Sequence, residues 1–100
     1  MRLCKVIWTE ESLENLDEIF DFLIISSLSK ASQVIESILK REEQLVIYPK
    51  SGAIQKSRKN KYEYRYLVED NYKIVYHLKD YVVFIDTVFD TRQNPDKMNV

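Results

Sequence analysis

Apolar residues recur at intervals of three and four through the first half of the chain, which is the spacing of an amphipathic helix. The first such stretch follows Thr9, a good helix cap, and Glu10 and Glu11 lie in its first turn. Its apolar stripe consists of Leu13, Leu16, Ile19, Phe20, Leu23 and Ile24. The pattern predicts a helix that ends near Ser26 and Ser27.

A second helical pattern begins after a short link. Ser29 is the expected cap, and Pro49 with Gly52 ends the stretch. The apolar side consists of Ala31, Val34, Ile35, Ile38, Leu39, Leu45 and Val46. Because a short connection makes neighbouring helices antiparallel, residues 9–48 are predicted to form a helical hairpin that lies on a sheet. Phe22 and Ile25 fall outside the first stripe, and they either pack on the second helix, which we expect, or remain exposed.

Alternation of apolar and polar residues replaces the helical spacing in the last third of the chain. Residues 62–69, 72–78 and 81–89 read as three strands joined by two tight turns, and residues 3–8 read as a short first strand. We therefore predict an α+β fold in the order β-α-α-β-β-β: an N-terminal strand, an antiparallel helical hairpin and a three-stranded antiparallel sheet. One domain should span residues 1–100.

The composition of the chain limits the classes of protein to which it can belong. The chain has 100 residues, of which 45% are hydrophobic and 31% charged, as in a small soluble domain. No apolar run approaches the roughly 20 residues of a membrane span, and no secretory signal follows Met1, so we expect a cytoplasmic protein. The single cysteine, Cys4, reads as a small buried hydrophobe. No feature calls for a metal or another cofactor, and the small core makes pairing with another chain plausible.

The net charge of −1 hides an uneven distribution. Residues 9–48 carry nine acidic against three basic residues, while residues 49–65 carry six basic against one acidic. Residues 50–61 show no periodicity and are predicted to form an exposed, mobile loop. The cations of this loop are Lys50, Lys56, Arg58, Lys59 and Lys61. They could attract phosphate or simply be solvated, and charge alone favours the second reading.

Polar residues of the strand region keep one parity within each strand. These residues are Arg65 in the first strand of the three, Lys73 and His77 in the second, and Asp86, Asp90 and Arg92 in the third and its extension. If the tyrosines and aliphatic residues face the helices, the polar set can converge on the opposite face and hold a phosphate or a carboxylate. The alternative, which the small effect of surface charges favours, is a solvated face with Arg92 paired to Asp86 or Asp90.

Three segments give the chain a likeness to a known family. They are residues 62–68 (YEYRYLV), 71–76 (NYKIVY) and 88–95 (VFDTRQNP), supported by Trp8 with Thr9 and by the loop at 48–52. Together they resemble the RelE/ParE superfamily of bacterial toxins from type II toxin-antitoxin systems. The resemblance implies a growth-inhibiting toxin, of the kind that stabilises plasmids, which a cognate antitoxin neutralises in a hetero-oligomer; a homodimer is also possible.

Two mechanisms share this fold, because RelE-like members cut mRNA on the ribosome and ParE-like members poison DNA gyrase. Arg65, Lys73 and Arg92 match basic positions of the RelE-like active face, so they are the catalytic candidates. However, Glu63 stands where RelE-like enzymes place a lysine, and residues 96–100 lack the tyrosine or histidine-tyrosine ending of the nucleases. The pI of about 5.8 also argues against a ribosome-binding nuclease. His77 matches no catalytic position and is expected to be structural.

We therefore favour the gyrase-targeting branch and leave open whether the protein is an enzyme. The expected target-binding residues are Lys56, Arg58, Lys59, Lys61, Arg65 and Arg92. The alternatives are a ribosome-dependent mRNA endonuclease, and a non-enzymatic interaction module or inactive relic of the family. The antitoxin is expected to contribute a disordered tail that folds as a helix or an added strand and carries acidic residues for the basic region at 50–65.

Overall fold

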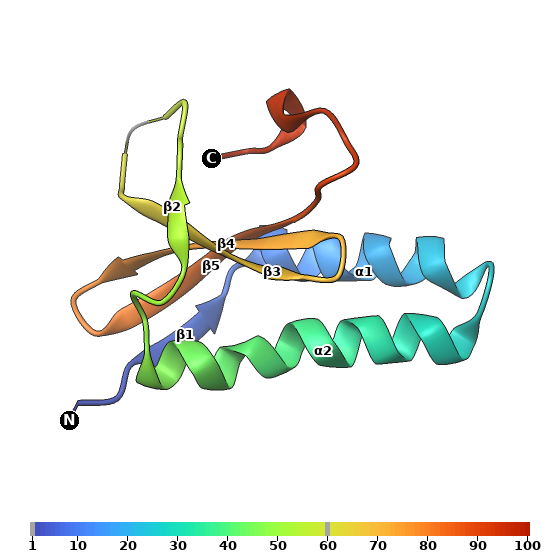
Figure 1. Cartoon of the computed structure of the whole chain (residues 1–100), viewed down its shortest axis with the longest axis horizontal. Coiled ribbons are helices and arrows are strands. Elements are labelled where there is room, and N and C mark those ends of the chain that lie inside the picture. Colours follow the sequence, from blue (N-terminus) through green and yellow to red (C-terminus); the bar gives the residue numbers. More distant parts are fainter. Residues whose placement is uncertain (1, 60) are drawn as a thin grey trace.

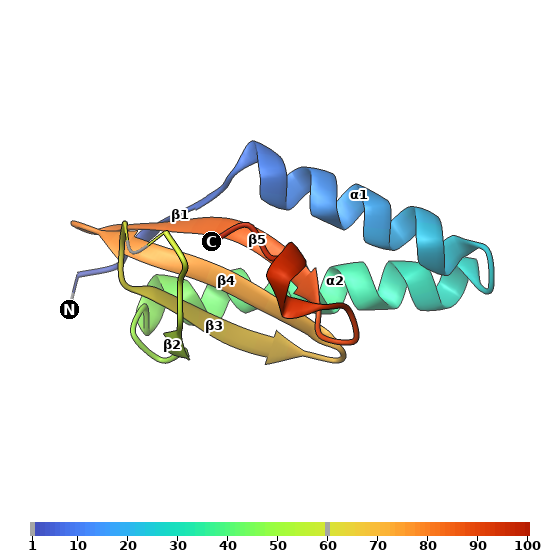
Figure 2. The same ribbon diagram turned by 90° about the horizontal axis from the view of Figure 1, so that it is seen from above.

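The computed structural model describes residues 2–59 and 61–100, and within them a helical hairpin packs on one face of a sheet (Figure 1). In chain order the elements are β1 (Lys5–Trp8), α1 (Glu10–Ile24), α2 (Leu28–Ile47), β2 (Ala53–Gln55), β3 (Tyr64–Glu69), β4 (Tyr72–Lys79), β5 (Val82–Asp90) and a short 3-10 helix, η1 (Pro95–Lys97). The predicted α+β class and the antiparallel helical hairpin are confirmed (Figure 2).

The sheet has five strands in the order β1-β5-β4-β3-β2, so the predicted three-stranded sheet was too small. β1 pairs in parallel with β5, and β2 pairs antiparallel with β3. β2 lies in the stretch predicted to be an irregular loop, and its three residues are too few to produce a visible alternation. The pairing of β1 joins residues almost 80 positions apart in sequence, Lys5 with Val82, and no local pattern encodes such a partner.

The helix ends follow from short polar side chains. Thr9 caps α1 as predicted, because its Oγ1 accepts a hydrogen bond from the Ser12 amide at 3.2 Å. The same hydroxyl donates to the Ile85 carbonyl at 2.8 Å, which ties the start of α1 to β5. α2 is capped by Ser27 instead of the predicted Ser29, since Ser27 Oγ accepts from the Lys30 amide at 3.1 Å. Both serines suit a cap, but only Ser27 has the extended backbone that a cap requires.

The main core lies between the hairpin and the sheet. Its buried members are Cys4, Leu16, Val34, Ile38, Leu45, Leu67, Tyr72, Ile74, Tyr76, Val83, Ile85 and Val88. Cys4 is buried as expected. Leu13, Ile24 and Leu39, which were predicted to face the core, are exposed, because each helix touches the sheet through only a narrow stripe.

Phe22 and Ile25 do not pack on α2 as expected. Their exposed fractions are 63% and 83%.

A β-bulge in β5 changes which side chains face the helices. Val75 of β4 pairs with Thr87 and Tyr76 pairs with Ile85, so Asp86 has no partner position and the register shifts by one residue. Asn15 of α1 lies beside the strand just after this shift. Its Oδ1 accepts hydrogen bonds from the Thr87 hydroxyl and the Val88 amide, both at 2.9 Å. The pairing of β1 with β5 ends at Ile85. Beyond that point the Asn15 side chain, instead of a strand, accepts the hydrogen bond from the Val88 amide at the outer edge of β5.

We expect Asn15→Ala to lower the free energy of unfolding by about 1–3 kcal/mol, because two donors in a poorly solvated position lose their acceptor. Urea denaturation of the purified protein measures the change. The matched control is Glu14→Ala at the exposed neighbouring position, which should change the free energy by less than about 0.5 kcal/mol. Equal stability of the two variants would contradict the role assigned to Asn15.

Candidate functional site

Strand register separates the basic residues that the sequence suggested for one site. Arg65 pairs with Tyr76 of β4, whose ring lies in the core beneath the helices. Lys73 pairs with Phe89 of β5, which lies on the opposite face of the sheet. Because directly paired residues of antiparallel strands share a face, Arg65 and Lys73 lie on different sides. The convergence of these side chains on one face, which the sequence left open, therefore does not occur.

The same register corrects two further expectations. The tyrosines of β3, Tyr64 and Tyr66, lie on the face away from the helices, whereas Tyr72 and Tyr76 of β4 face them. The bulge at Asp86 has a similar effect within β5. Asp86 lies beside His77, while Asp90 is paired with Tyr72 on the helix side. The alternation of residues within a single strand does not reveal that the tyrosines of β3 and β4 face opposite ways, or that Asp86 and Asp90 do.

Arg65 holds the chain between α2 and β2. Its Nη1 donates to the carbonyls of Lys50 at 3.2 Å and Gly52 at 2.9 Å, and its Nη2 donates to the Glu63 carboxylate at 3.1 Å. The Gly52 amide in turn donates to the buried Tyr76 hydroxyl at 3.0 Å. A Cβ at Gly52 would lie 2.6 Å from that hydroxyl, so only glycine fits there. These contacts make Arg65 a positioning residue for the β2 connection.

Lys73 contributes to a hollow on the sheet face away from the helices. Its Nζ donates to the Gln55 side chain at 3.0 Å and lies 4.2 Å from the ring centroid of Tyr66. The hollow has a volume of about 270 Å³, and Lys56, Arg58 and Lys73 line it together with residues of the C-terminal segment. We call it the basic hollow. The structure thus brings Lys56 and Arg58 of the predicted site together with Lys73 and leaves Arg65 outside.

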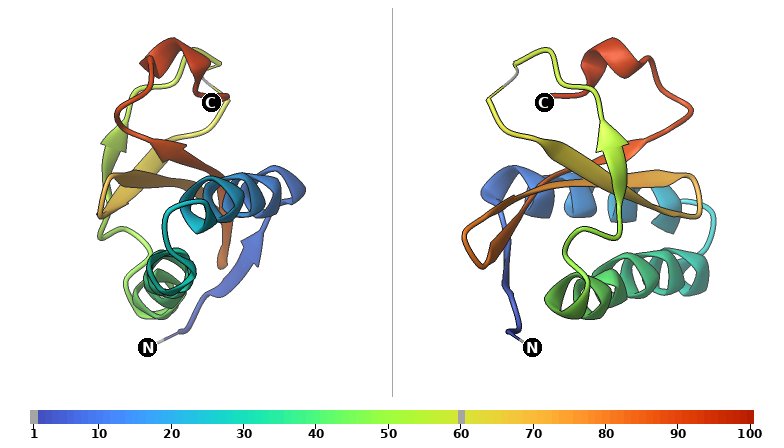
Figure 3. Two further views of the ribbon diagram at one scale, coloured as in Figure 1. Left: turned by 90° about the vertical axis from the view of Figure 1, so that its right-hand side faces the viewer. Right: turned by 60° about the vertical axis from the view of Figure 1, so that its left-hand side comes forward.

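The C-terminal segment, residues 91–100, crosses the face of the sheet that the helices leave open (Figure 3). Met98 and Val100 are buried there against Tyr64, Val75 and Phe89. The sequence predicts no structural role for this segment, because it is short and mostly polar and shows no periodicity. The only local signal is Asn94, which caps η1 through its side-chain oxygen.

Two of the predicted target-binding cations hold this segment in place. The Arg58 guanidinium donates to the carbonyls of Asp96 and Met98, the latter at 3.2 Å. Lys59 Nζ donates to the Asn99 side chain at 2.8 Å. Lys56 and Lys61 are exposed, and Lys61 Nζ lies 5.7 Å from the ring centroid of Tyr62. Lys56 and Lys61 are thus more available to a partner than Arg58 and Lys59.

Arg92 forms a paired interaction with Asp90 just beyond β5. Its Nε donates to Oδ1 at 3.0 Å and its Nη2 donates to Oδ2 at 2.9 Å, which is the two-pronged geometry of strong arginine-carboxylate pairs. The hydrogen bond from Arg92 holds the pKa of Asp90 below its ordinary value. The predicted alternative of an Arg92 ion pair with Asp90 agrees with this geometry. The Arg92 side chain remains 56% exposed and can still meet a partner.

His77 lies inside an aromatic stack. Its ring is parallel to that of Tyr62 at a centroid distance of 4.0 Å, and Phe84 stacks at 5.1 Å. Its Nδ1 lies 2.6 Å from Asp86 Oδ2. Burial raises the pKa of Asp86, and the hydrogen bond with His77 opposes that effect. His77 is only 7% exposed, so these contacts serve the packing of the sheet face.

Among residues 2–59 and 61–100, no group of three or more His, Cys, Asp or Glu side chains lies close enough together to hold a metal ion. Neither α1 nor α2, nor any other helix in that part of the chain, has the length and apolarity needed to cross a membrane.

The fold of this chain is shared with a known structure. It matches a chain described as the chromosomal ParDE TA system from P. aeruginosa with a TM-score of 0.73. The match covers 88% of this chain and 96% of that chain at 19% sequence identity. At that identity the match shows only a common fold. Both chains therefore belong to the same class of small α+β proteins. No curated protein matches the sequence.

The family follows from the sequence match. A model of the ParE toxin of type II toxin-antitoxin systems, parDE, matches residues 6–95, and the chain belongs to this family. The resemblance predicted from the strand region is therefore confirmed, and within the broader superfamily the match is to the ParE branch. Arg65, Lys73 and Arg92 all lie inside the matched range.

We expect Arg58→Gln to loosen the C-terminal segment, because the segment loses two hydrogen bonds from a charged donor. Removal of Val100 and Asn99 by a carboxypeptidase, followed by mass spectrometry, should be about tenfold faster or more. Lys56→Gln is the matched control, since Lys56 lines the same hollow and is exposed. An unchanged rate in Arg58→Gln would mean that apolar packing of Met98 and Val100 alone holds the segment.

The Asp90 pair predicts a pH dependence. Because the folded pKa of Asp90 is lowered, the carboxylate contributes stability above its unfolded pKa of about 3.9, and this contribution is lost as the pH falls through the folded value. Arg92→Gln should move the Asp90 pKa upward, as measured by NMR titration of the carboxyl carbon. The control, Arg58→Gln, should leave that pKa unchanged. A low Asp90 pKa that persists without Arg92 would contradict the assigned cause.

Proposed function

We propose that this toxin arrests bacterial growth by inhibiting DNA gyrase in the cytoplasm, and that a cognate antitoxin neutralises it. Membership of the ParE toxin family supports the general assignment. The observation that carries the choice of target is the separation of Arg65 from Lys73 by the sheet. Cleavage of RNA requires a base, an acid and cations around one phosphate, and the residues suggested for that work do not meet.

The state of the other candidates favours the same proposal. His77, the only histidine of the sequence, is stacked between two rings and hydrogen-bonded to Asp86. Lys73 is engaged with Gln55, and Arg92 is engaged with Asp90. A protein that inhibits a target by binding needs exposed complementary groups instead of a poised acid and base. Lys56 and Lys61 are exposed cations of this kind, and we assign them to the contact with the target.

Purified toxin should inhibit DNA supercoiling by gyrase in a concentration-dependent way, and induction of the toxin alone should stop growth.

Lys56→Glu combined with Lys61→Glu should weaken the inhibition of supercoiling about tenfold or more, because the reversed charges repel a target surface that attracted the two lysines. Lys40→Glu is the matched control, since Lys40 is an exposed lysine on α2, away from the basic hollow.

Three results would count against the proposal. Full supercoiling activity in the presence of folded toxin would remove gyrase as the target. Cleavage of mRNA at ribosomal A-site codons would establish the nuclease mechanism in its place. Undiminished inhibition by the folded double variant would exclude Lys56 and Lys61 from the contact.

A further inference from the structure

The outer surface of α1 is acidic, and its carboxylates form no ion pair with another described residue. Its carboxylates are Glu10, Glu11, Glu14, Asp17, Glu18 and Asp21, and the helix contains no lysine or arginine. Within residues 2–59 and 61–100 the ion pairs join Arg41 with Glu69, Arg65 with Glu63, His77 with Asp86, and Arg92 with Asp90. None of these pairs includes a residue of α1. Uncompensated charge of one sign on a helix attracts a segment of the opposite sign.

Two large apolar side chains interrupt this acidic surface. Phe22 and Ile25 are 63% and 83% exposed, and they lie next to Glu18 and Asp21 along the helix. Helical spacing places Glu11, Glu18 and Phe22 in one row, and Glu14, Asp21 and Ile25 in the adjacent row. Two neighbouring apolar side chains that remain mostly in water provide apolar area that a partner can cover. The two rows therefore have the composition of a binding surface: apolar anchors with a charged border.

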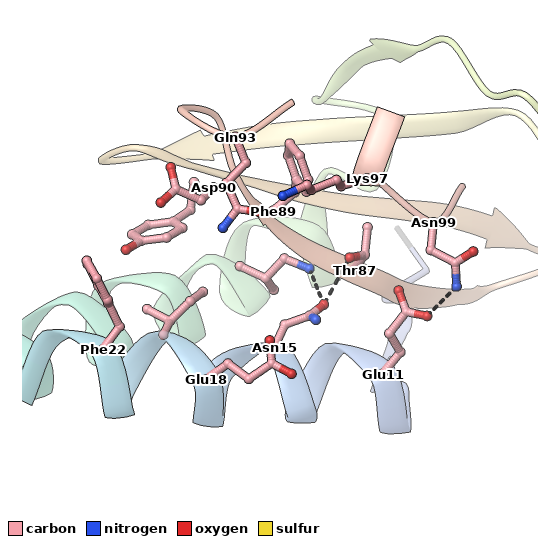
Figure 4. A pocket seen from close by; sticks show the side chains of 13 residues that line it. Glu11, Asn15, Glu18, Phe22, Thr87, Phe89, Asp90, Gln93, Lys97 and Asn99 are labelled. Atoms are coloured by element: carbon pink, nitrogen blue, oxygen red, sulfur yellow. Dashed lines mark hydrogen bonds between the residues drawn. The ribbon is translucent and has the colours of Figure 1, made fainter. Parts of the chain in front are cut away.

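A groove extends this surface toward the sheet. It has a volume of about 420 Å³ and lies between α1, the end of β5 and the C-terminal segment (Figure 4). Glu11, Glu18 and Phe22 line it from α1, and Asp90 and Lys97 are among its residues on the other side. Asp90 is paired with Arg92, and Glu11 accepts a hydrogen bond from the Asn99 side-chain Nδ2 at 2.7 Å. Glu18 is the exposed carboxylate of the groove that remains for a partner.

The basic surface at 50–65 fits a partner less well than the sequence suggested. Arg58 and Lys59 are occupied by the C-terminal segment, and Arg65 is occupied by the carbonyls of Lys50 and Gly52. An acidic tail that bound these three residues would first have to break the contacts they make within the chain. Glu14, Glu18 and Asp21 on α1 take part in none of the ion pairs between described residues, so a partner could bind them without breaking such a pair.

We propose that α1 and its groove bind the antitoxin through a segment that places lysine or arginine side chains beside apolar ones. The apolar side chains of the segment cover Phe22 and Ile25, and its cations pair with Glu14, Glu18 and Asp21. This inference rests on the proposed function, because it assumes an antitoxin as the occupant. It assigns a cationic segment of the antitoxin to α1, in place of the acidic contact expected at the basic region, where Arg58, Lys59 and Arg65 are already engaged.

Binding of the protein encoded beside the toxin gene tests the proposal by surface plasmon resonance. The triple variant Glu14→Lys, Glu18→Lys, Asp21→Lys should bind about tenfold more weakly or worse, with the loss mainly in the association rate, and it should abolish the decrease of that rate with added salt. Phe22→Ala should raise the dissociation rate about tenfold. The controls are Glu36→Lys with Glu43→Lys on α2, and Tyr48→Ala, whose exposed fraction of 61% matches that of Phe22.

Growth assays separate this inference from the proposed function. Each α1 variant, with an unchanged circular dichroism spectrum, should still arrest growth alone, and co-expressed antitoxin should no longer rescue the cells. Wild-type affinity in the α1 variants, or equal losses in the controls, would overturn the inference. Loss of toxicity in a folded α1 variant would also overturn it, because α1 would then contact the target. If the wild type does not inhibit gyrase but binds the antitoxin through α1, the proposed function fails and the inference stands.

Discussion

The register of β4 between its two neighbours is the constraint on which the rest of the structure depends. β4 is hydrogen-bonded to β5 along its whole length on one side and to β3 from Tyr72 to His77 on the other. Alternate side chains of a strand point to opposite faces, so this register decides which residues of three strands lie under the helices. Tyr76 and Ile74 are completely buried there, and Arg65 must share their side. The opposite face receives Lys73 and His77.

That division gives the two faces different chemistry. The helix-covered face is a conventional apolar core, into which Arg65 reaches only at the edge, where backbone carbonyls receive it. The open face would expose Tyr64, Val75 and Phe89, and the C-terminal segment covers them with Met98 and Val100. Arg58 contributes to this arrangement more as an anchor for carbonyl groups than as a free cation. Some cations of a basic loop can thus hold the fold together, while others remain exposed to a partner.

Acidic and basic residues of this toxin are concentrated on different secondary-structure elements. The helix α1 is acidic along its exposed side, and the connection between β2 and β3 is basic, so a chain with a net charge of −1 presents two surfaces of opposite sign. Such surfaces act on association with partners more than on stability, because exposed charges are well solvated in the folded and the unfolded chain. A small toxin that must meet both a target and an antitoxin benefits from separate surfaces for the two.

The sequence by itself determined the helical hairpin, the three consecutive strands and the family, because these depend on the spacing of neighbouring residues and on short local motifs. It also identified Thr9 as a cap and Cys4 as a core residue for the same reason. Only the tertiary structure decided that β1 and β2 join the sheet, that the bulge at Asp86 shifts the faces of β5, and that Arg65 and Lys73 are separated. Each of these depends on pairing between distant segments, and parity within one strand cannot tell which of two faces meets the helices.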